Sequence, residues 1–191
     1  EVIFSAMVSF AIPEQGLDYQ IPAPEYPAPE TLLSEQERKI LIQEDIPEFM
    51  RKLVMRQFDL RMHPVNPNNP FRPEKSEAQY AEYMQSFAQI SGDFDCTMFH
   101  QAIAAYYSDY NLLTTSLRPH GVSYANGDVH SASLDHAIYF HQDFRVDEWL
   151  LYDMHATRSS QSRGLNFGQF WQKEQLVCSV TQESLMRVRQ K

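Results

Sequence analysis

The sequence has few cysteines and no long hydrophobic segment, and both shortages restrict the kind of protein it can be. Cys96 and Cys178 are the two cysteines of a 191-residue chain, and two cysteines cannot build a disulfide framework. We therefore expect a reducing compartment. The longest apolar segments, such as 102–107, are far shorter than the ~20 residues of a membrane-spanning helix. We therefore expect no membrane span.

Positive charge is also scarce. The chain has 16 Lys and Arg against 25 Asp and Glu, giving a formal net charge of -9 and a pI near 5.2. A nucleic-acid-binding protein needs a basic face that neutralises phosphates, so this function is disfavoured. An anionic small ligand would need a local cluster of cations, and Arg158 and Arg163 are the best candidates. A solvated loop would account for these two arginines equally well.

The first third of the chain reads as a strand, a connector and a helix. Residues 1–12 alternate and branch like a strand, and the chain begins inside this pattern. Residues 13–33 hold five of the 11 prolines, which favours an extended linker. Ser34 and Glu37 form a capping box, so a helix is expected to start there and to stop or restart at Pro47.

The next segment is harder to assign. Residues 53–62 alternate well enough to predict a strand, and prolines at 64, 67, 70 and 73 predict an irregular loop after it. Residues 76–90 have helical spacing of their large side chains, although 83–90 also alternates. The pattern alone favours a helix over 76–90.

A clearer helix is predicted over 97–117, with Asp95 as its N-cap. Alanines at 102, 104 and 105 would let a sheet approach this helix closely. Its apolar stripe consists of Phe99, Ile103, Tyr106, Tyr107 and Tyr110.

Four strand-like runs follow the predicted helix with short connections. The break at Gln142 and Asp143 also suggests that the runs on either side of it pair with each other. One long helix followed by several strands indicates an α+β fold in which an antiparallel sheet wraps around the helix. The four runs are 129–141, 147–157, 163–172 and 175–188.

An acidic residue interrupts the first of these runs. Asp135 lies between Leu134 and Ile138, and a carboxylate in such a segment must be hydrogen-bonded, paired or functional. The motifs Leu134-Asp135-His136, Phe140-His141 and Trp-Leu-Leu-Tyr at 149–152 resemble those of the type II acyl-CoA thioesterases. These are double-hotdog enzymes with bacterial and peroxisomal members.

This resemblance implies a division of the chain. Residues 53–191 would be the C-terminal hotdog domain of a double hotdog, and 13–52 would be the linker and a short helix before it. Residues 1–12 would be the closing strand of a truncated N-terminal hotdog. The resemblance also implies a strand, not a helix, within 76–90.

The resemblance further implies a catalytic site. The family's aspartate, hydroxyl residue and glutamine fall on Asp135, Thr157 and Gln182, which together would hold the water that attacks an acyl-CoA thioester. No cofactor or metal is needed, because a thioester is already activated and a positioned water with a nearby base suffices. Backbone amides at the start of the 97–117 helix would stabilise the oxyanion. Arg158 and Arg163 would meet the phosphates of coenzyme A.

Purely structural roles remain open for the same residues. Asp135 can be an ion-pair or capping residue, Thr157 a strand-end threonine and Gln182 an edge-strand polar residue. A hotdog hydratase would use a His and an acid on the helix, where His100 and Asp109 are available. A non-catalytic acyl-CoA-binding or assembly domain is the third possibility.

Three positions depart from the family pattern: Asn166, Gln169 and Ser184, the last of which is usually Gly. They are expected to alter packing or chain-length preference without touching the three catalytic positions. The four residues His130, Asp135, His136 and His141 are close in sequence, yet His136 and His141 would face opposite sides of a regular strand, so no metal site is expected. We expect a homo-oligomer formed through hotdog sheets, in a peroxisomal or cytoplasmic location.

Overall fold

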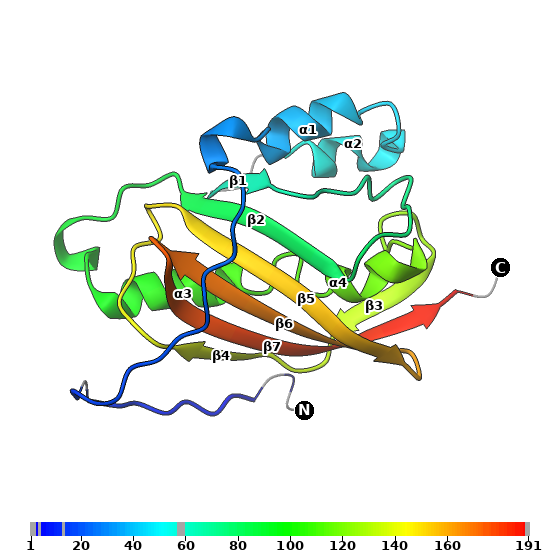
Figure 1. Ribbon diagram of the computed structural model, residues 1–191. Helices are drawn as coiled ribbons and strands as arrows, with labels where there is room; N and C mark the ends of the chain where they lie inside the picture. Colours follow the sequence, from blue (N-terminus) through cyan, green and yellow to red (C-terminus); the bar gives the residue numbers. More distant parts are fainter. Residues whose placement is uncertain (1–2, 4, 13, 57–59, 190–191) are drawn as a thin grey trace.

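A curled antiparallel sheet forms the body of the protein (Figure 1). The computed structural model describes residues 3, 5–12, 14–56 and 60–189. Within this part of the chain the strand order is β1-β2-β5-β6-β7-β3, and β4 also pairs with β7. The strands are β1 (Leu60–Pro64), β2 (Gln79–Ser86), β3 (Val129–Ser133), β4 (Ala137–Phe140), β5 (Leu150–Ser160), β6 (Arg163–Gln172) and β7 (Gln175–Val188).

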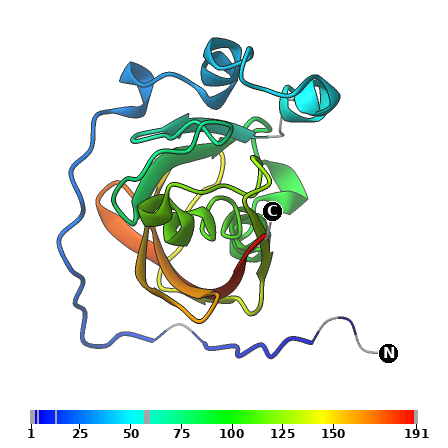
Figure 2. The ribbon, with the colours of Figure 1, turned by 90° about the vertical axis from the view of Figure 1, so that its right-hand side faces the viewer.

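The helices lie on different sides of this sheet. Figure 2 shows α3 and α4 enclosed by the curve of the sheet, with α1 and α2 outside it. None of the helices in the described ranges is both long and apolar enough to cross a membrane. The α-helices are α1 (Glu35–Leu41), α2 (Glu48–Val54), α3 (Thr97–Tyr107) and α4 (Thr114–Leu117), and the 3-10 helices are η1 (Pro29–Thr31), η2 (Gly92–Phe94) and η3 (Arg118–His120).

The main core fills the space between α3 and the inner face of the sheet. Ala104 is fully buried, so α3 approaches the strands closely there. Tyr152 of β5 and Phe170 of β6 stack with ring centroids 3.9 Å apart. The Tyr152 hydroxyl donates a 2.6 Å hydrogen bond to the carbonyl of Ser108 at the end of α3, which satisfies one polar group of the helix terminus.

The predicted strands at 163–172 and 175–188 are confirmed with the same bounds. Two tight turns set these bounds. Gln161 and Ser162 have φ values of 50° and 60°, and Lys173 and Glu174 have 50° and 66°. Two consecutive positive φ values are typical of hairpin turns whose twist matches that of the strands.

The predicted 97–117 helix is wrong in its length and in its cap. The helix stops at Tyr107 and a short α4 starts at Thr114, because Asn111 adopts φ = 58° and a left-handed residue cannot continue an α-helix. The N-cap is Cys96, without a side-chain cap bond. Four residues of the predicted stripe pack in or against the core, but Tyr106 is 64% exposed.

Several other sequence predictions are also wrong. The helix favoured over 76–90 is strand β2, as the family resemblance implied. The strand expected over 53–62 overlaps the end of α2 and the start of β1, with 57–59 outside the described residues. The run 147–157 becomes a strand only from Leu150. The runs beside the break at 142–143 do not pair, since β4 joins β7 while β5 joins β2 and β6.

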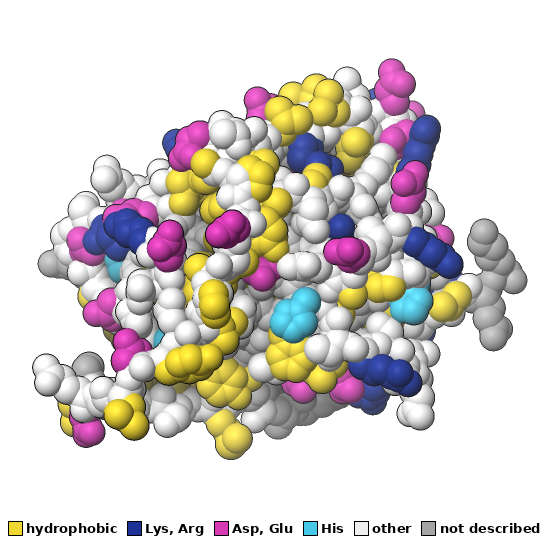
Figure 3. All heavy atoms as spheres, in the orientation of Figure 1, with side chains coloured by type: hydrophobic (Ala, Val, Ile, Leu, Met, Phe, Trp, Pro, Cys, Tyr) yellow, Lys and Arg dark blue, Asp and Glu magenta, His cyan; other side chains and the backbone are white. Residues whose placement is uncertain are grey.

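The segment before α1 crosses the outer face of the sheet as a strap, defined as residues 14–34 (Figure 1). Tyr26 donates a 3.0 Å hydrogen bond to Asp153 of β5, and it packs with Ala23 against an outer cluster around Trp171. A band of hydrophobic side chains follows the path of the strap down this face (Figure 3). The predicted connector is therefore an outer cover for the sheet.

The two ends of this segment test the N-terminal predictions differently. The capping box is confirmed, because Ser34 accepts from the Glu37 amide and the Glu37 carboxylate accepts from the Ser34 amide. Residues 3 and 5–12 are exposed and belong to no strand. Their role as the closing strand of another hotdog stays a prediction.

Candidate active site

Asp135 lies in a break between β3 and β4. The two strands pair with β7 at Ser133↔Ser184 and Ala137↔Thr181, so three residues, 134–136, stand opposite two. The Glu183 amide donates a 2.7 Å hydrogen bond to Asp135 Oδ1. The carboxylate thus replaces the carbonyl that would continue the ladder, which explains why the predicted 129–141 strand is two strands.

Asp135 is exposed, not buried in an apolar segment as its neighbours suggested. Its Oδ1 is held by Glu183, and Oδ2 accepts no hydrogen bond from any residue in the described ranges. One carboxylate oxygen is therefore fixed in position while the other is available to a ligand or a water.

Gln182 lies on β7, with its side chain fully buried beside this break. His136 Nδ1 lies 2.9 Å from Gln182 Oε1, and since an amide oxygen only accepts, the histidine is the donor. Gln182 Nε2 donates to Ser133 Oγ at 2.6 Å, and Ser133 Oγ donates to Asp109 Oδ1 at 3.1 Å. These contacts fix the orientation of the amide and leave one of its two N–H donors for another partner.

His136 also ties this group to the helix. Its Nε2 lies 2.7 Å from Ser108 Oγ, at the residue that ends α3. The ring therefore joins the Gln182 side chain to the C-terminal end of α3. Nothing in the sequence signals this role beyond the position of His136 next to Asp135.

Thr157 lies at a register shift in β5, between the pairs Ala156↔Asn166 and Arg158↔Leu165. Asn166 in turn pairs with Gln182, so Thr157 is at the level of the Gln182 site but two strands away, roughly 10 Å at ordinary strand spacing. Thr157 is exposed, and its side chain makes no hydrogen bond with the residues described. Asp135 and Gln182 lie on facing segments, since Asp135 bonds Glu183 while Gln182 bonds Ser133 and His136. Among the residues described, no hydrogen bond joins Thr157 to either of them.

Asn166 is a site residue that the sequence marked only as a departure from the family pattern. It is fully buried, and its Oδ1 accepts hydrogen bonds from Thr115 and Ser116 of α4. Its Nδ2 donates to the Gln182 carbonyl at 3.2 Å and to Ser184 Oγ at 2.9 Å. Two departures from the family pattern therefore bond to each other, and together they anchor α4 to the strand that carries Gln182. The expectation that the departures leave the catalytic positions untouched is wrong for Asn166, because it bonds the Gln182 carbonyl.

The two candidate coenzyme A-binding arginines differ in their surroundings. Arg163 Nη1 forms a 2.6 Å ion pair with Glu183 Oε2, so its charge is already balanced. Arg158 is exposed, and no side chain in the described ranges pairs with it. Both lie at the same end of the sheet as Asp135, because Leu165 pairs with Arg158 on one side and with Glu183, the partner of Asp135, on the other.

The expected oxyanion donors at the start of α3 are contradicted by the geometry. The Gln182 and Asp135 group contacts Ser108 and Asp109 at the C-terminal end of α3, whereas Thr97 at the other end bonds Asp143. An 11-residue helix separates its ends by about 16 Å. Moreover, the C-terminal end of a helix carries partial negative charge, which disfavours an oxyanion.

The structure also separates His100 and Asp109, the two residues that a hotdog hydratase would need side by side. His100 Nδ1 accepts from the Val146 amide and its Nε2 bonds Asp95 Oδ1, each at 3.3 Å. Asp109 lies past the other end of α3 and bonds Ser133. His100 and Asp109 are therefore separate structural groups and not an acid–base pair.

Two further kinds of chemistry have little support. No group of three or more His, Cys, Asp or Glu side chains in the described ranges is placed to hold a metal ion. Burial raises the pKa of the Cys178 thiol well above its usual range, which disfavours the nucleophilic thiolate.

Comparison with known proteins places this chain in a family. The family described as acyl-CoA thioesterase matches residues 50–185. The chain belongs to this family. Human acyl-coenzyme A thioesterase 8 is 31% identical over 196 residues, covering 98% of this chain and 60% of the relative. The chain thus spans about three fifths of the length of such curated acyl-CoA thioesterases.

Solved structures confirm the predicted hotdog fold. An acyl-CoA thioesterase II from Mycobacterium marinum matches with a TM-score of 0.68 and 26% identity, over 92% of this chain and 59% of that one. A hot dog fold protein from Alicyclobacillus acidocaldarius matches with a TM-score of 0.62 at 16% identity, over 93% and 59% of the two chains. The sheet around α3 in this acyl-CoA thioesterase family member is therefore a hotdog domain.

Proposed function

We propose that the protein containing this chain hydrolyses acyl-CoA thioesters to free fatty acid and coenzyme A. The observation that carries the proposal is the placement of Asp135 beside Gln182. One carboxylate oxygen is held by the Glu183 amide and the other is available, while Gln182 keeps one amide proton unused. Together these groups offer an acceptor and a donor for one water molecule.

In this reaction Asp135 takes a proton from the water as its oxygen bonds to the thioester carbonyl carbon. The C–S bond then breaks, and the proton passes from Asp135 to the departing thiolate. Gln182 donates to the water and orients it, and Thr157 on β5 is the third proposed positioning residue. Positioning and general-base assistance of this kind supply the rate enhancement without a cofactor.

Because the N-terminal end of α3 is far from Asp135 and Gln182, the hydrogen-bond donors that stabilise the oxyanion have to come from elsewhere. Because the chain spans about three fifths of its curated relatives, we assign them to a part of the whole protein beyond this chain. In this proposal residues 1–12 close the sheet of a first hotdog, 13–52 connect, and 53–191 form the second hotdog. The first hotdog would then pack near Asp135 and complete the site.

Substrate binding, assembly and location follow as parts of the same proposal. Arg158, which lacks a side-chain partner among the described residues, and Arg163 would bind the phosphates of coenzyme A. Homo-oligomers would form through the hotdog sheets. Cys96 and Cys178 are both free thiols, which supports a peroxisomal or cytoplasmic location.

The deciding experiment measures thiol release from short, medium and long acyl-CoAs by the full-length protein and by this chain. Asp135→Asn is the best variant, because the amide oxygen can still accept from Glu183 while the base is lost. We expect its kcat to fall by about 100-fold to 10,000-fold. Asp143→Asn, a change at an exposed carboxylate that bonds Thr97, is the matched control.

The results separate the proposed thioesterase from its rivals. If Asp135→Asn hydrolyses as fast as the wild type, water activation by Asp135 is refuted. If the folded full-length protein binds acyl-CoA but releases no thiol from any chain length, the protein is instead a non-catalytic binding domain. Activity of the full-length protein without activity of this chain would support a site completed by the first hotdog.

A further inference from the structure

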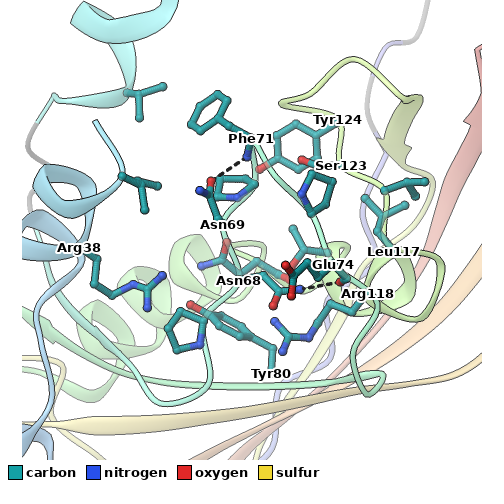
Figure 4. A pocket seen from close by; sticks show the side chains of 18 of the residues that line it. Arg38, Asn68, Asn69, Phe71, Glu74, Tyr80, Leu117, Arg118, Ser123 and Tyr124 are labelled. Carbon is teal, nitrogen blue, oxygen red and sulfur yellow. Dashed lines mark hydrogen bonds between the residues drawn. The ribbon is translucent and has the colours of Figure 1, made fainter. Parts of the chain in front are cut away.

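A cavity of about 200 Å³ opens at the end of β1, away from the Asp135 and Gln182 site. Its walls come from α1, the loop 67–74, the α4–η3 segment and the loop 122–124 (Figure 4). Helix α4 separates the two sites. Thr114 and Leu117 of α4 line the cavity, whereas Thr115 and Ser116 bond Asn166 on the other side.

Two arginines project into this cavity toward the ring of Tyr80 (Figure 4). Arg118 is 9% exposed, and its guanidinium carbon lies 5.5 Å from the Tyr80 ring centroid. It donates from Nε to the Glu77 carbonyl and from Nη2 to the Asn66 carbonyl. Since a guanidinium has five N–H donors, three remain for a ligand.

Arg38 comes from α1 on the facing wall. It is partly buried, and its side chain has no hydrogen bond or ion pair to any residue in the described ranges. Burial lowers the pKa of Arg38, and the nearby Glu35 carboxylate opposes this shift only in part, as expected for a cation that has lost water without gaining a hydrogen-bonded partner. An anion between Arg38 and Arg118 would compensate that loss.

The charges around the cavity sum to about one positive charge. Arg38, Lys39 and Arg118 are balanced in part by two acids, Glu35 and Glu74. The remaining acid, Glu82, lies behind Tyr80 and accepts from the Tyr80 hydroxyl at 3.1 Å. Burial raises the pKa of Glu82 to about 8, so its carboxyl is mostly neutral at pH 7. The cavity therefore favours a monoanion over a dianion such as a phosphate monoester.

The rest of the lining is largely apolar. A dry cavity of about 150 Å³ holds a benzene molecule, so 200 Å³ accommodates a short hydrocarbon chain beside a carboxylate. The apolar lining side chains are Ile42, Val54, Pro67, Pro70, Phe71, Pro73, Leu117 and Val122.

We propose that this cavity is a second ligand site, which binds a short-chain monocarboxylate. Arg38 and Arg118 hold the carboxylate with charge-assisted hydrogen bonds, and the hydrocarbon tail packs beside Phe71. Carboxylates are also the product class of the proposed hydrolysis, but binding at this cavity does not depend on that reaction.

The test is calorimetric titration of this chain with hexanoate, in the wild type and in three variants. Arg38→Gln should weaken binding by about 10-fold to 100-fold, the effect of losing one charge-assisted hydrogen bond. Arg51→Gln removes the same charge from an exposed position of α2 and should leave affinity unchanged. Val122→Trp fills the cavity with both arginines retained, and it should abolish binding.

Further titrations test which chemical class of ligand binds and whether it binds in this cavity. Hexylamine should not bind, and inorganic phosphate should bind more weakly than hexanoate. The proposal is overturned if the wild type shows no saturable hexanoate binding, if Arg38→Gln binds as tightly as the wild type, or if phosphate binds as well as hexanoate. Asp135→Asn should bind hexanoate normally, and a loss there would instead place the carboxylate at the hydrolytic site.

Discussion

The side chain of Gln182 is held by its neighbours in a way that suits its proposed positioning role. A buried amide with free rotation could not orient a water, yet here both ends are held. His136 donates to its oxygen, and Ser133 accepts from its nitrogen. The neighbours of Asp135 in sequence thus position the proposed partner of Asp135 in space.

His136→Phe should separate this role from simple packing. The ring volume is kept, but Gln182 Oε1 loses its donor in a buried place, so we expect the free energy of unfolding to fall by about 1–3 kcal/mol. For the proposed hydrolysis by the full-length protein, kcat should fall more than KM rises, since orientation of the water is lost and substrate binding is not. Chemical denaturation and steady-state kinetics would measure the two effects.

His141→Phe is the control for His136→Phe. His141 is exposed and its ring bonds Ser179 Oγ at 2.8 Å, so its replacement should change stability by less than about 0.5 kcal/mol. Equal effects of the two substitutions on kcat would argue against a positioning role for His136.

Glu82 gives a pH dependence of stability with a defined sign. Burial raises its folded pKa from 4.5 to about 8, although hydrogen bonds from Asn111 and Tyr80 oppose the shift. The folded state therefore binds the proton more tightly, and its contribution to stability is complete below pH 4.5 and lost as pH rises toward 8. Glu82→Gln should remove this loss, so its advantage over the wild type should grow across that window to a few kcal/mol.

Denaturant unfolding at intervals across this pH window would measure the difference. Glu48→Gln, at an exposed position of α2, controls for the loss of one carboxylate. A Glu82→Gln curve that stays parallel to the wild-type curve from pH 4.5 to 8 would contradict the proposed neutral, buried carboxyl.

At the scale of elements, the local sequence pattern correctly predicted the two strands that end in tight turns, β6 and β7. The bounds of β6 and β7 followed from apolar alternation, with turn residues at 161–162 and 173–174. The helix expected over 76–90 failed because Tyr80 and Met84, four residues apart, both point into the core from an eight-residue strand. A spacing of four residues puts two side chains on the same face of either a helix or a strand, and only the pairing with β1 and β5 decides between the two structures.

Two interruptions of predicted elements could not be predicted from local sequence pattern, because each involves a contact between distant parts of the chain. The interruption of 129–141 depends on the Glu183 amide binding the Asp135 carboxylate, a contact 48 residues apart in sequence. The break between α3 and α4 contains Asn111, which has a left-handed φ of 58° and whose side chain donates to the buried Glu82. The family resemblance suggested Asp135 and Gln182 as site residues, and this assignment stays a proposal. The contacts of Asn166, His136 and Ser133 with Gln182 arise from packing that one sequence does not reveal.

At the scale of the whole molecule, the sheet is covered on its inner face and on part of its outer face, and it has an open edge at β3 and β4. Helix α3 fills the inner face, and the strap of residues 14–34 covers part of the outer face. In the part of the chain described, β3 and β4 pair with β7 alone, so they form an open edge. Large apolar side chains are exposed along this edge and on the adjoining α3, namely Leu134 at 45%, Tyr139 at 56%, Met98 at 74% and Tyr106 at 64%.

An open strand edge with exposed apolar side chains favours pairing with another sheet. We therefore expect this chain to self-associate through β4 as its concentration rises, and Tyr139→Lys should weaken that association by at least about 10-fold, because it places a charge on the edge. Sedimentation over a concentration series would measure the change. Leu41→Lys, at a site on α1 that is 71% exposed, should leave the association as it is. Association that is insensitive to Tyr139→Lys but lost with Leu41→Lys would instead place the contact on the helical side of the molecule.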